Sequence, residues 1–151
     1  MALSRRSLAA RAAALVLVGG LGSAPALAED EAPEKVVIEF GAAALTPETA
    51  RVRSGGEVSW VNNATGRNGF IVFPLSIEFD FTCKPLHPAF KEIAAGWRSA
   101  PITAEKGFSL PCPLKPGKHP YRLHLYDSKR DLSEVGEGDP SGDMRGHIVV
   151  E

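Results

Sequence analysis

Apolar and polar residues alternate along several short segments of this chain, and a period of two is typical of a β-strand with one buried face. The clearest alternation covers residues 36–40, 58–62 and 119–125. Residues 70–73 are apolar throughout, which favours a strand that is covered on both sides. A Pro-Gly turn, the long alternating strand, a loop and an apolar end at residues 144–150 predict a closing hairpin. We therefore predict an all-β chain folded as an antiparallel sandwich.

The middle of the chain is less regular. Residues 77–83 and 108–112 alternate again and are predicted to be strands that carry Cys83 and Cys112 on their apolar sides. Pro and Gly residues interrupt the region between them, and a short helix over residues 89–95 is weakly signalled because it lacks a clear cap. The variable region is thus predicted to add at most one short helix to the sandwich.

Two stretches of this chain resemble a known family. Val58-Ser59-Trp60-Val61-Asn62 follows a Gly-Gly turn, and the closing hairpin carries Met144-Arg145-Gly146 before its Val-rich end. These stretches resemble the cupredoxins, the blue copper proteins, most closely the amicyanin and plastocyanin type. The resemblance implies a cupredoxin-like Greek-key β-sandwich over residues 36–151, and we expect its closing hairpin to pair with the strand through Trp60.

The copper-ligand positions that this resemblance implies are largely changed. In the family a Cys, two His and a Met bind copper. In register with that motif, Leu123 falls at the Cys position, Tyr126 at a His position and Met144 at the Met position. Asn68, eight residues after Trp60, falls at the position of the other His. A type 1 centre needs a thiolate and two imidazoles, so we expect a degenerate site gathered at one pole of the sandwich.

Other side chains leave a copper site open as the alternative. His119 shares the inward parity of the core residues around it, whereas His124 and His147 fall on the outward side of their strands. A surface pair of His124 and His147, with Asp127 or Asp143, would bind Cu(II) or Zn(II) loosely. The expectation is therefore no cofactor, with copper on a non-standard site as the alternative. That alternative site would use His124, His147, Met144 and His119.

The N-terminal residues predict export. Residues 1–28 combine a basic start, an apolar run too short to span a bilayer and a small-x-small end at Ala26-Leu27-Ala28, which is typical of a signal peptide. The Ser4-Arg5-Arg6 start resembles a twin-arginine signal, with the general secretory route as the alternative. Residues 29–35 are predicted to be a flexible acidic leader. We expect a soluble periplasmic protein with no membrane span once the signal is removed.

The two cysteines support the same compartment. In an oxidising compartment the default for Cys83 and Cys112 is a disulfide, with two buried thiols or a thiolate metal site as alternatives. Cys83 and His87 would supply a thiolate and an imidazole to a metal, but a disulfide removes that thiolate.

Charge and motifs narrow the classes of function. Without the three arginines of the signal, 14 Lys and Arg remain against 18 Asp and Glu, a net charge near −4. That balance argues against nucleic acid as a partner. No Gly-x-Ser-x-Gly or His-Glu-x-x-His motif occurs, so we expect no enzyme.

The loop over residues 127–143 is rich in Asp, Glu and Gly. It lacks the ligand spacing of an EF-hand, so a solvated loop is favoured over a Ca²⁺ site. Long loops on a rigid scaffold are common binding surfaces. We therefore expect a non-redox interaction protein that contacts a protein partner through Asn68 and the loop from Asp127 to Met144.

Overall fold

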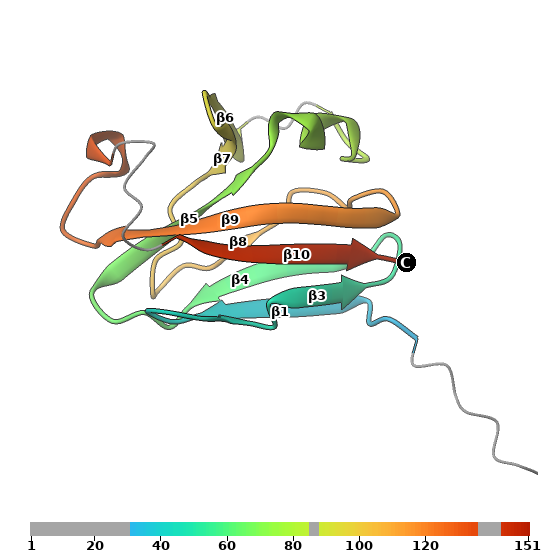
Figure 1. Ribbon diagram of the computed structural model, residues 1–151, viewed down its shortest axis with the longest axis horizontal. Coiled ribbons are helices and arrows are strands. Elements are labelled where there is room, and N and C mark those ends of the chain that lie inside the picture. The colour runs from blue at the N-terminus through green and yellow to red at the C-terminus, as the bar shows by residue number, and fades with distance from the viewer. Residues whose placement is uncertain (1–30, 85–87, 136–142) are drawn as a thin grey trace, which may run out of the picture.

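The structure is a computed structural model that describes residues 31–84, 88–135 and 143–151. Its strands form two sheets that pack face to face (Figure 1). The four-stranded sheet has the order β2-β1-β4-β8, and the six-stranded sheet has the order β3-β10-β9-β5-β7-β6. The strands are β1 (Lys35–Phe40), β2 (Leu45–Thr46), β3 (Thr49–Val52), β4 (Glu57–Asn62), β5 (Arg67–Phe73), β6 (Phe90–Ile93), β7 (Gly96–Ser99), β8 (Phe108–Ser109), β9 (Gly117–Asp127) and β10 (Met144–Val150). Two short 3-10 helices are also present, η1 (Leu75–Phe79) and η2 (Leu132–Glu134).

A layer of buried aromatic and aliphatic side chains joins the two sheets. Its centre is formed by Trp60 of β4, Phe73 of β5 and Tyr121 of β9. The Trp60 and Tyr121 rings meet edge to face with their centroids 5.4 Å apart, and the Trp60 and Phe73 rings do so at 6.4 Å. Burial raises the pKa of Tyr121 to about 12, so its hydroxyl stays protonated at neutral pH. These contacts fix the two sheets against each other.

The predicted all-β sandwich is confirmed, although its pairing is mixed. β9 and β10 form the predicted closing hairpin, with Val150 opposite Gly117 at one end and Met144 opposite Leu123 at the other. The pairs β1–β4 and β3–β10 are parallel, which alternation alone does not reveal. The expected pairing of the hairpin with the strand through Trp60 is wrong. β4 lies in the other sheet and contacts the hairpin through side chains across the core.

The prediction of a strand over residues 77–83 is also wrong. Those residues hold the end of η1 and an irregular turn, and the Phe79 side chain is 62% exposed. Pro74 stands directly before η1, where its missing N–H and fixed φ favour the first turn of a helix over a further ladder bond. Likewise, the strand predicted over residues 108–112 is limited to the two residues of β8.

The short helix predicted over residues 89–95 is replaced by the hairpin β6–β7. Phe90 is buried against Phe73 and Phe81, with ring centroids 5.9 and 5.7 Å away. This tertiary contact overrides the helix propensity of the neighbouring Ala and Lys residues. The hairpin turn ends at Gly96, whose φ of 141° suits glycine.

The predicted export signal over residues 1–28 lies outside the described residues, as does the first part of the leader. The rest of the leader is attached to the sandwich. Ala32 is buried, and the carbonyls of Pro33 and Glu34 accept hydrogen bonds from the N–H groups of Arg53 and Glu57 at 3.0 and 2.8 Å. The expectation of a flexible leader is therefore wrong for residues 32–34.

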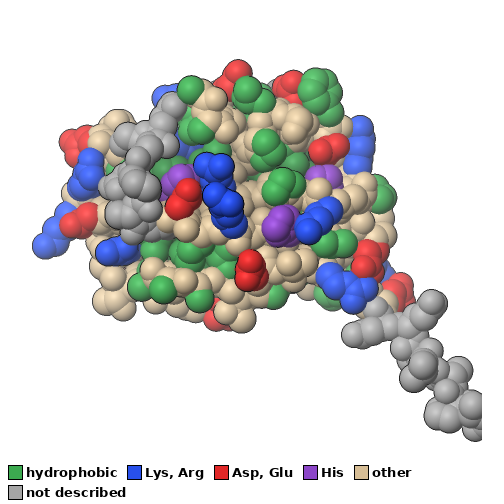
Figure 2. Space-filling model, viewed as in Figure 1, with side chains coloured by type: hydrophobic (Ala, Val, Ile, Leu, Met, Phe, Trp, Pro, Cys, Tyr) green, Lys and Arg blue, Asp and Glu red, His purple; other side chains and the backbone are tan. Residues whose placement is uncertain are grey.

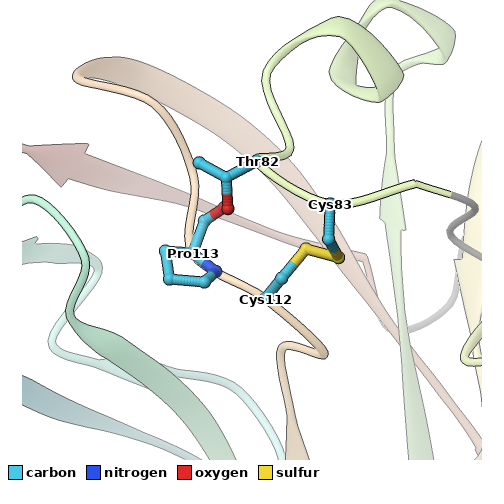
Figure 3. Close-up of a disulfide and its surroundings, with 4 residues drawn as sticks. All are labelled: Thr82, Cys83, Cys112 and Pro113. Atoms are coloured by element: carbon cyan, nitrogen blue, oxygen red, sulfur yellow. A yellow bond between two sulfur atoms is a disulfide. The ribbon is translucent and has the colours of Figure 1, made fainter.

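The predicted disulfide between Cys83 and Cys112 is present (Figure 3). It joins two loops, one after η1 and one after β8, so the expectation that both cysteines lie within strands is wrong. Beside it, Thr82 donates its backbone N–H and its hydroxyl to the Pro113 carbonyl at 3.0 and 2.9 Å. The disulfide and these bonds fasten the irregular middle of the chain to the segment that leads into β9.

The first prediction concerns Gly146, which lies opposite Tyr121 in the hairpin. A Cβ atom at this position would clash with the phenol ring of Tyr121, so Gly146→Ala should displace that ring from the core. We expect a loss of about 1 to 3 kcal/mol in the free energy of unfolding, the usual cost of overpacking, measured by urea denaturation. Gly41→Ala is the control, because no atom lies within 4 Å of its added Cβ. Equal unfolding midpoints for the two variants would contradict this packing.

The second prediction concerns the disulfide. The bonded cysteines are 29 residues apart, and closing a loop of that size in the unfolded chain stabilises the fold by roughly 3 to 4 kcal/mol. Cys83→Ser/Cys112→Ser should lose most of that stability in denaturant titrations. Wild type that has been reduced and alkylated should behave similarly. Two titratable thiols in the native, unreduced protein would rule the disulfide out.

Candidate functional site

The four positions that correspond to copper ligands lie on three neighbouring strands. Asn68 of β5 is directly opposite Tyr126 of β9, and Leu123 of β9 is directly opposite Met144 of β10. Asn62 holds the turn before β5, since its side chain donates to the carbonyl of Arg67 at 2.8 Å. The register therefore brings the four positions to one end of the six-stranded sheet.

The four side chains divide between the two faces of that sheet. Leu123 is completely buried in the core between the sheets, and Met144 packs against the same core. Tyr126 and its partner Asn68 belong to the opposite, outward face, because residues of even and odd number on β9 point to opposite sides. The positions are adjacent, but their side chains do not converge on one point.

These residues do not fit a type 1 copper ion. Leu123 has no lone pair where the thiolate is needed, and it fills the core instead. Burial raises the pKa of Tyr126 above its usual value, and the Asn68 side chain opposes this by a smaller amount, so the phenol remains a protonated and poor ligand. Only Met144 retains a copper-binding atom, and a thioether alone binds weakly.

His119 points inward, as its parity predicts, and it is only 4% exposed. Its Nε2 atom lies 2.8 Å from the Lys115 carbonyl, and its Nδ1 atom lies 3.5 Å from a carboxylate oxygen of Asp80. Both ring nitrogens therefore face oxygen acceptors of this chain. His119 connects the start of β9 to the turn after η1, which is a structural role.

His124 and His147 both lie on the outward face, as predicted, but they are not neighbours. His147 is opposite Pro120, four residues before His124 on β9, which corresponds to roughly 13 Å along the strand. His124 instead lies with Nδ1 3.2 Å from Asp143 and stacks on Phe70 at a centroid distance of 5.0 Å. Within residues 31–84, 88–135 and 143–151, no three His, Cys, Asp or Glu side chains lie close enough to hold a metal. His87 lies outside those residues.

The loop from Asp127 begins with an ordered turn, and residues 127–131 are exposed, as expected of a solvated loop. Asp131 caps η2 by accepting from the Ser133 hydroxyl at 2.6 Å and from its N–H at 2.8 Å, and these bonds lower the pKa of its carboxyl group. Val135, 6% exposed, then packs on Phe70 and Tyr126. This part of the loop covers the outward face near Asn68. Residues 136–142, which include Glu137 and Asp139 of the candidate Ca²⁺ loop, lie outside the described residues.

A groove of about 640 Å³ lies on the outward face beside this cover. Its apolar wall is formed by Val72, Pro74, Ala95 and Pro120. Its polar side chains are Arg122 and His124 from β9 and Arg145 and His147 from β10. Figure 2 shows His, Lys and Arg side chains close together over the region of β9 and β10. We define these residues as the cationic groove.

The sequence interpretation missed the two arginines of this groove. The alternation of β9 already places Arg122 on the outward side, with His124. The alternation does not reveal which residue of the next strand lies beside each residue of β9. The pairing of Arg122 with Arg145 follows only from the register of the hairpin.

Three solved structures that resemble this chain are cupredoxins. A reduced proline-to-phenylalanine variant of amicyanin is 14% identical, with a TM-score of 0.46, over 78% of this chain and 82% of that chain. A Cu(I) methionine-to-alanine variant of amicyanin is 15% identical, with a TM-score of 0.48, over 81% and 87%. A purple cupredoxin from Nitrosopumilus maritimus is 14% identical, with a TM-score of 0.41, over 77% and 99%. No protein-family model and no curated protein matches the chain.

The fold is a cupredoxin-like β-sandwich, as the resemblance in sequence implies. Its two mixed sheets and its closing hairpin carry the residues of both motifs. The part of the chain that the structure describes contains no helix long and apolar enough to cross a membrane.

The third prediction concerns the pH dependence of stability. Burial lowers the pKa of His124 below its usual 6.5, Asp143 opposes this, and Arg122 adds to it. The unfolded chain therefore takes up this proton at a higher pH than the folded chain, so stability should fall as the pH drops through about 6.5. A His124→Phe variant keeps an aromatic ring for Phe70 but does not titrate. Urea denaturation between pH 7 and pH 5 should show a smaller loss of unfolding free energy in this variant than in the wild type. The same dependence of unfolding free energy on pH in both proteins would contradict the assignment to His124.

Proposed function

We propose that this chain is an exported, non-redox interaction protein built on a cupredoxin-like sandwich that has lost its type 1 copper site. The observation that carries the proposal is the placement of Leu123. It stands at the thiolate position of the motif and is completely buried in the hydrophobic core, opposite Met144. The thiolate dominates the bonding of a blue copper centre, so the chemistry of that centre is lost with it.

The other ligand positions support the same conclusion. Asn68 and Tyr126 are paired on the outward face, while Met144 packs inward. An ion bound by Asn68 or Tyr126 would therefore lie on the opposite side of the sheet from Met144. Replacing single residues would not restore a centre whose donors point to opposite faces.

Export is supported by two independent features. The first 28 residues have the basic start, apolar run and small-x-small end of a signal peptide. The disulfide between Cys83 and Cys112 is of a kind that persists in oxidising compartments such as the periplasm.

The proposed partner is a protein that contacts the outward face near Asn68 and the described start of the loop that follows Asp127. η2 and Val135 give this surface a fixed shape, since they pack on the sheet. Binding surfaces commonly form where loops are held by a rigid scaffold. The net negative charge of the exported chain argues against nucleic acid as the partner.

Copper handling through His119, His124, His147 and Met144 is less well supported. His119 faces the core and already lies beside two oxygen atoms, and His124 and His147 are separated along the hairpin. Met144 faces the core side of β10, away from His124. The register favours no pair among these residues as joint ligands of one ion.

The fourth prediction tests the loss of the copper site. The exported chain, loaded with Cu(II), should show no intense absorption at about 600 nm, because that band requires a copper–thiolate bond. A Leu123→Cys variant should also fail to show it, since Asn68 and Tyr126 supply no imidazole and belong to the other face. A cupredoxin with all four ligands, measured in parallel, provides the positive control. A blue band in the wild type would overturn the proposed function.

A further inference from the structure

Three arginines lie at one level across the outward face of the six-stranded sheet. Val72 of β5 is opposite Arg98 of β7 on one side and opposite Arg122 of β9 on the other. Arg122 is in turn opposite Arg145 of β10. Directly opposed residues in antiparallel strands project from the same face. We call Arg98, Arg122 and Arg145 the arginine row, and its three steps between strands span about 14 Å.

Arg122 and Arg145 of this row form no ion pair with a described residue, although Asp143 lies 3.2 Å from the neighbouring His124. Like charges directly opposite each other destabilise a strand pair, and Arg122 and Arg145 are such a pair. Both are exposed, and no described Asp or Glu lies within 4.0 Å of either guanidinium. By contrast, Arg51 and Arg53 pair with glutamates. The row is therefore a local excess of positive charge on a chain that is negative overall.

The row borders apolar surface as well. Arg122 and Arg145 line the cationic groove together with Val72 and Pro120, and no Asp or Glu contributes to its described lining. Arg98 is opposite Val72 but does not line the groove, and its guanidinium lies 5.6 Å from the centre of the Phe70 ring. The buried Nε atom of Arg98 has no hydrogen-bond partner within the described parts of the chain. The site thus combines arginine donors with an apolar wall.

We propose that the cationic groove binds an extended acidic segment of a partner protein, in which carboxylates alternate with apolar residues. Arg donors form paired, charge-assisted hydrogen bonds with carboxylates, and the wall of Val72, Pro74 and Pro120 accepts the apolar side chains. Side chains on one side of an extended peptide repeat every 7 Å or so, so a segment with three such carboxylates has the same span as the row, about 14 Å. A small dicarboxylate reaches two of the arginines and leaves the wall uncovered. This inference rests on the proposed function, extends the partner's contact from the surface near Asn68 to the groove beside it, and names the chemistry of the partner.

The fifth prediction tests this site with a defined probe. A blocked eight-residue peptide of alternating Glu and Val, labelled at one end, should bind the full exported chain in fluorescence anisotropy titrations. Replacing Arg122 or Arg145 by Gln should weaken binding roughly tenfold or more each, because hydrogen bonds between charged groups are lost. Higher salt should weaken binding of the wild type, since the site is exposed. Arg53→Gln, in the turn between β3 and β4, is the matched control and should bind like wild type.

Two further probes distinguish binding of an acidic peptide from binding of a small free carboxylate. The same peptide with Gln in place of Glu should not bind, and succinate should compete only weakly. No binding of the acidic peptide, or binding that Arg122→Gln and Arg145→Gln leave unchanged, would overturn the inference. So would succinate binding as tightly as the peptide. Unchanged unfolding midpoints in both Arg variants would show that the fold is intact. None of these results alters the copper test, so the inference and the proposed function fail independently.

Discussion

The contact between Trp60 and Tyr121 across the two sheets is the interaction on which the rest of the structure depends. The two sheets pack against each other through their inward faces, and these two rings, with Phe73, lie at the point where those faces meet. Aromatic side chains contribute the largest buried areas of a core, and losing one generally costs about 3 to 5 kcal/mol. Gly146 is required beside them because the Tyr121 ring occupies the space of its missing side chain. The Trp and Gly of the two sequence motifs are therefore explained by packing, without reference to copper.

The same core accounts for the residue that occupies the thiolate position of the motif. Leu123 lies on β9 two residues beyond Tyr121, on the same inward side. At that position a leucine strengthens the hydrophobic core, whereas a thiolate would need a metal or a hydrogen bond to offset its burial. Tyr126, three residues further on, faces the other way and is covered by Val135. One side of β9 thus builds the core, and the other side carries both the covered Tyr126 and the exposed Arg122.

The sequence predicted the parts of the fold that depend on local period. Alternation along β9 correctly separated the inward residues Tyr121 and Leu123 from the outward His124. It failed where long-range contacts decide the structure, as at Phe90, whose burial turns a predicted helix into a hairpin. It also could not reveal the arginine row, because Arg98, Arg122 and Arg145 become neighbours only through the pairing of four strands. Side-chain direction is a local property of a strand, but register is not.

The outermost strands of the four-stranded sheet, β2 and β8, are only two residues long, and those of the six-stranded sheet, β3 and β6, are four. A long exposed edge offers unpaired N–H and C=O groups to which another chain can add. These short edges offer few such groups, so a second copy finds little template on which to extend either sheet. The short outermost strands therefore disfavour polymerisation by the addition of strands, independently of the charges on the surface.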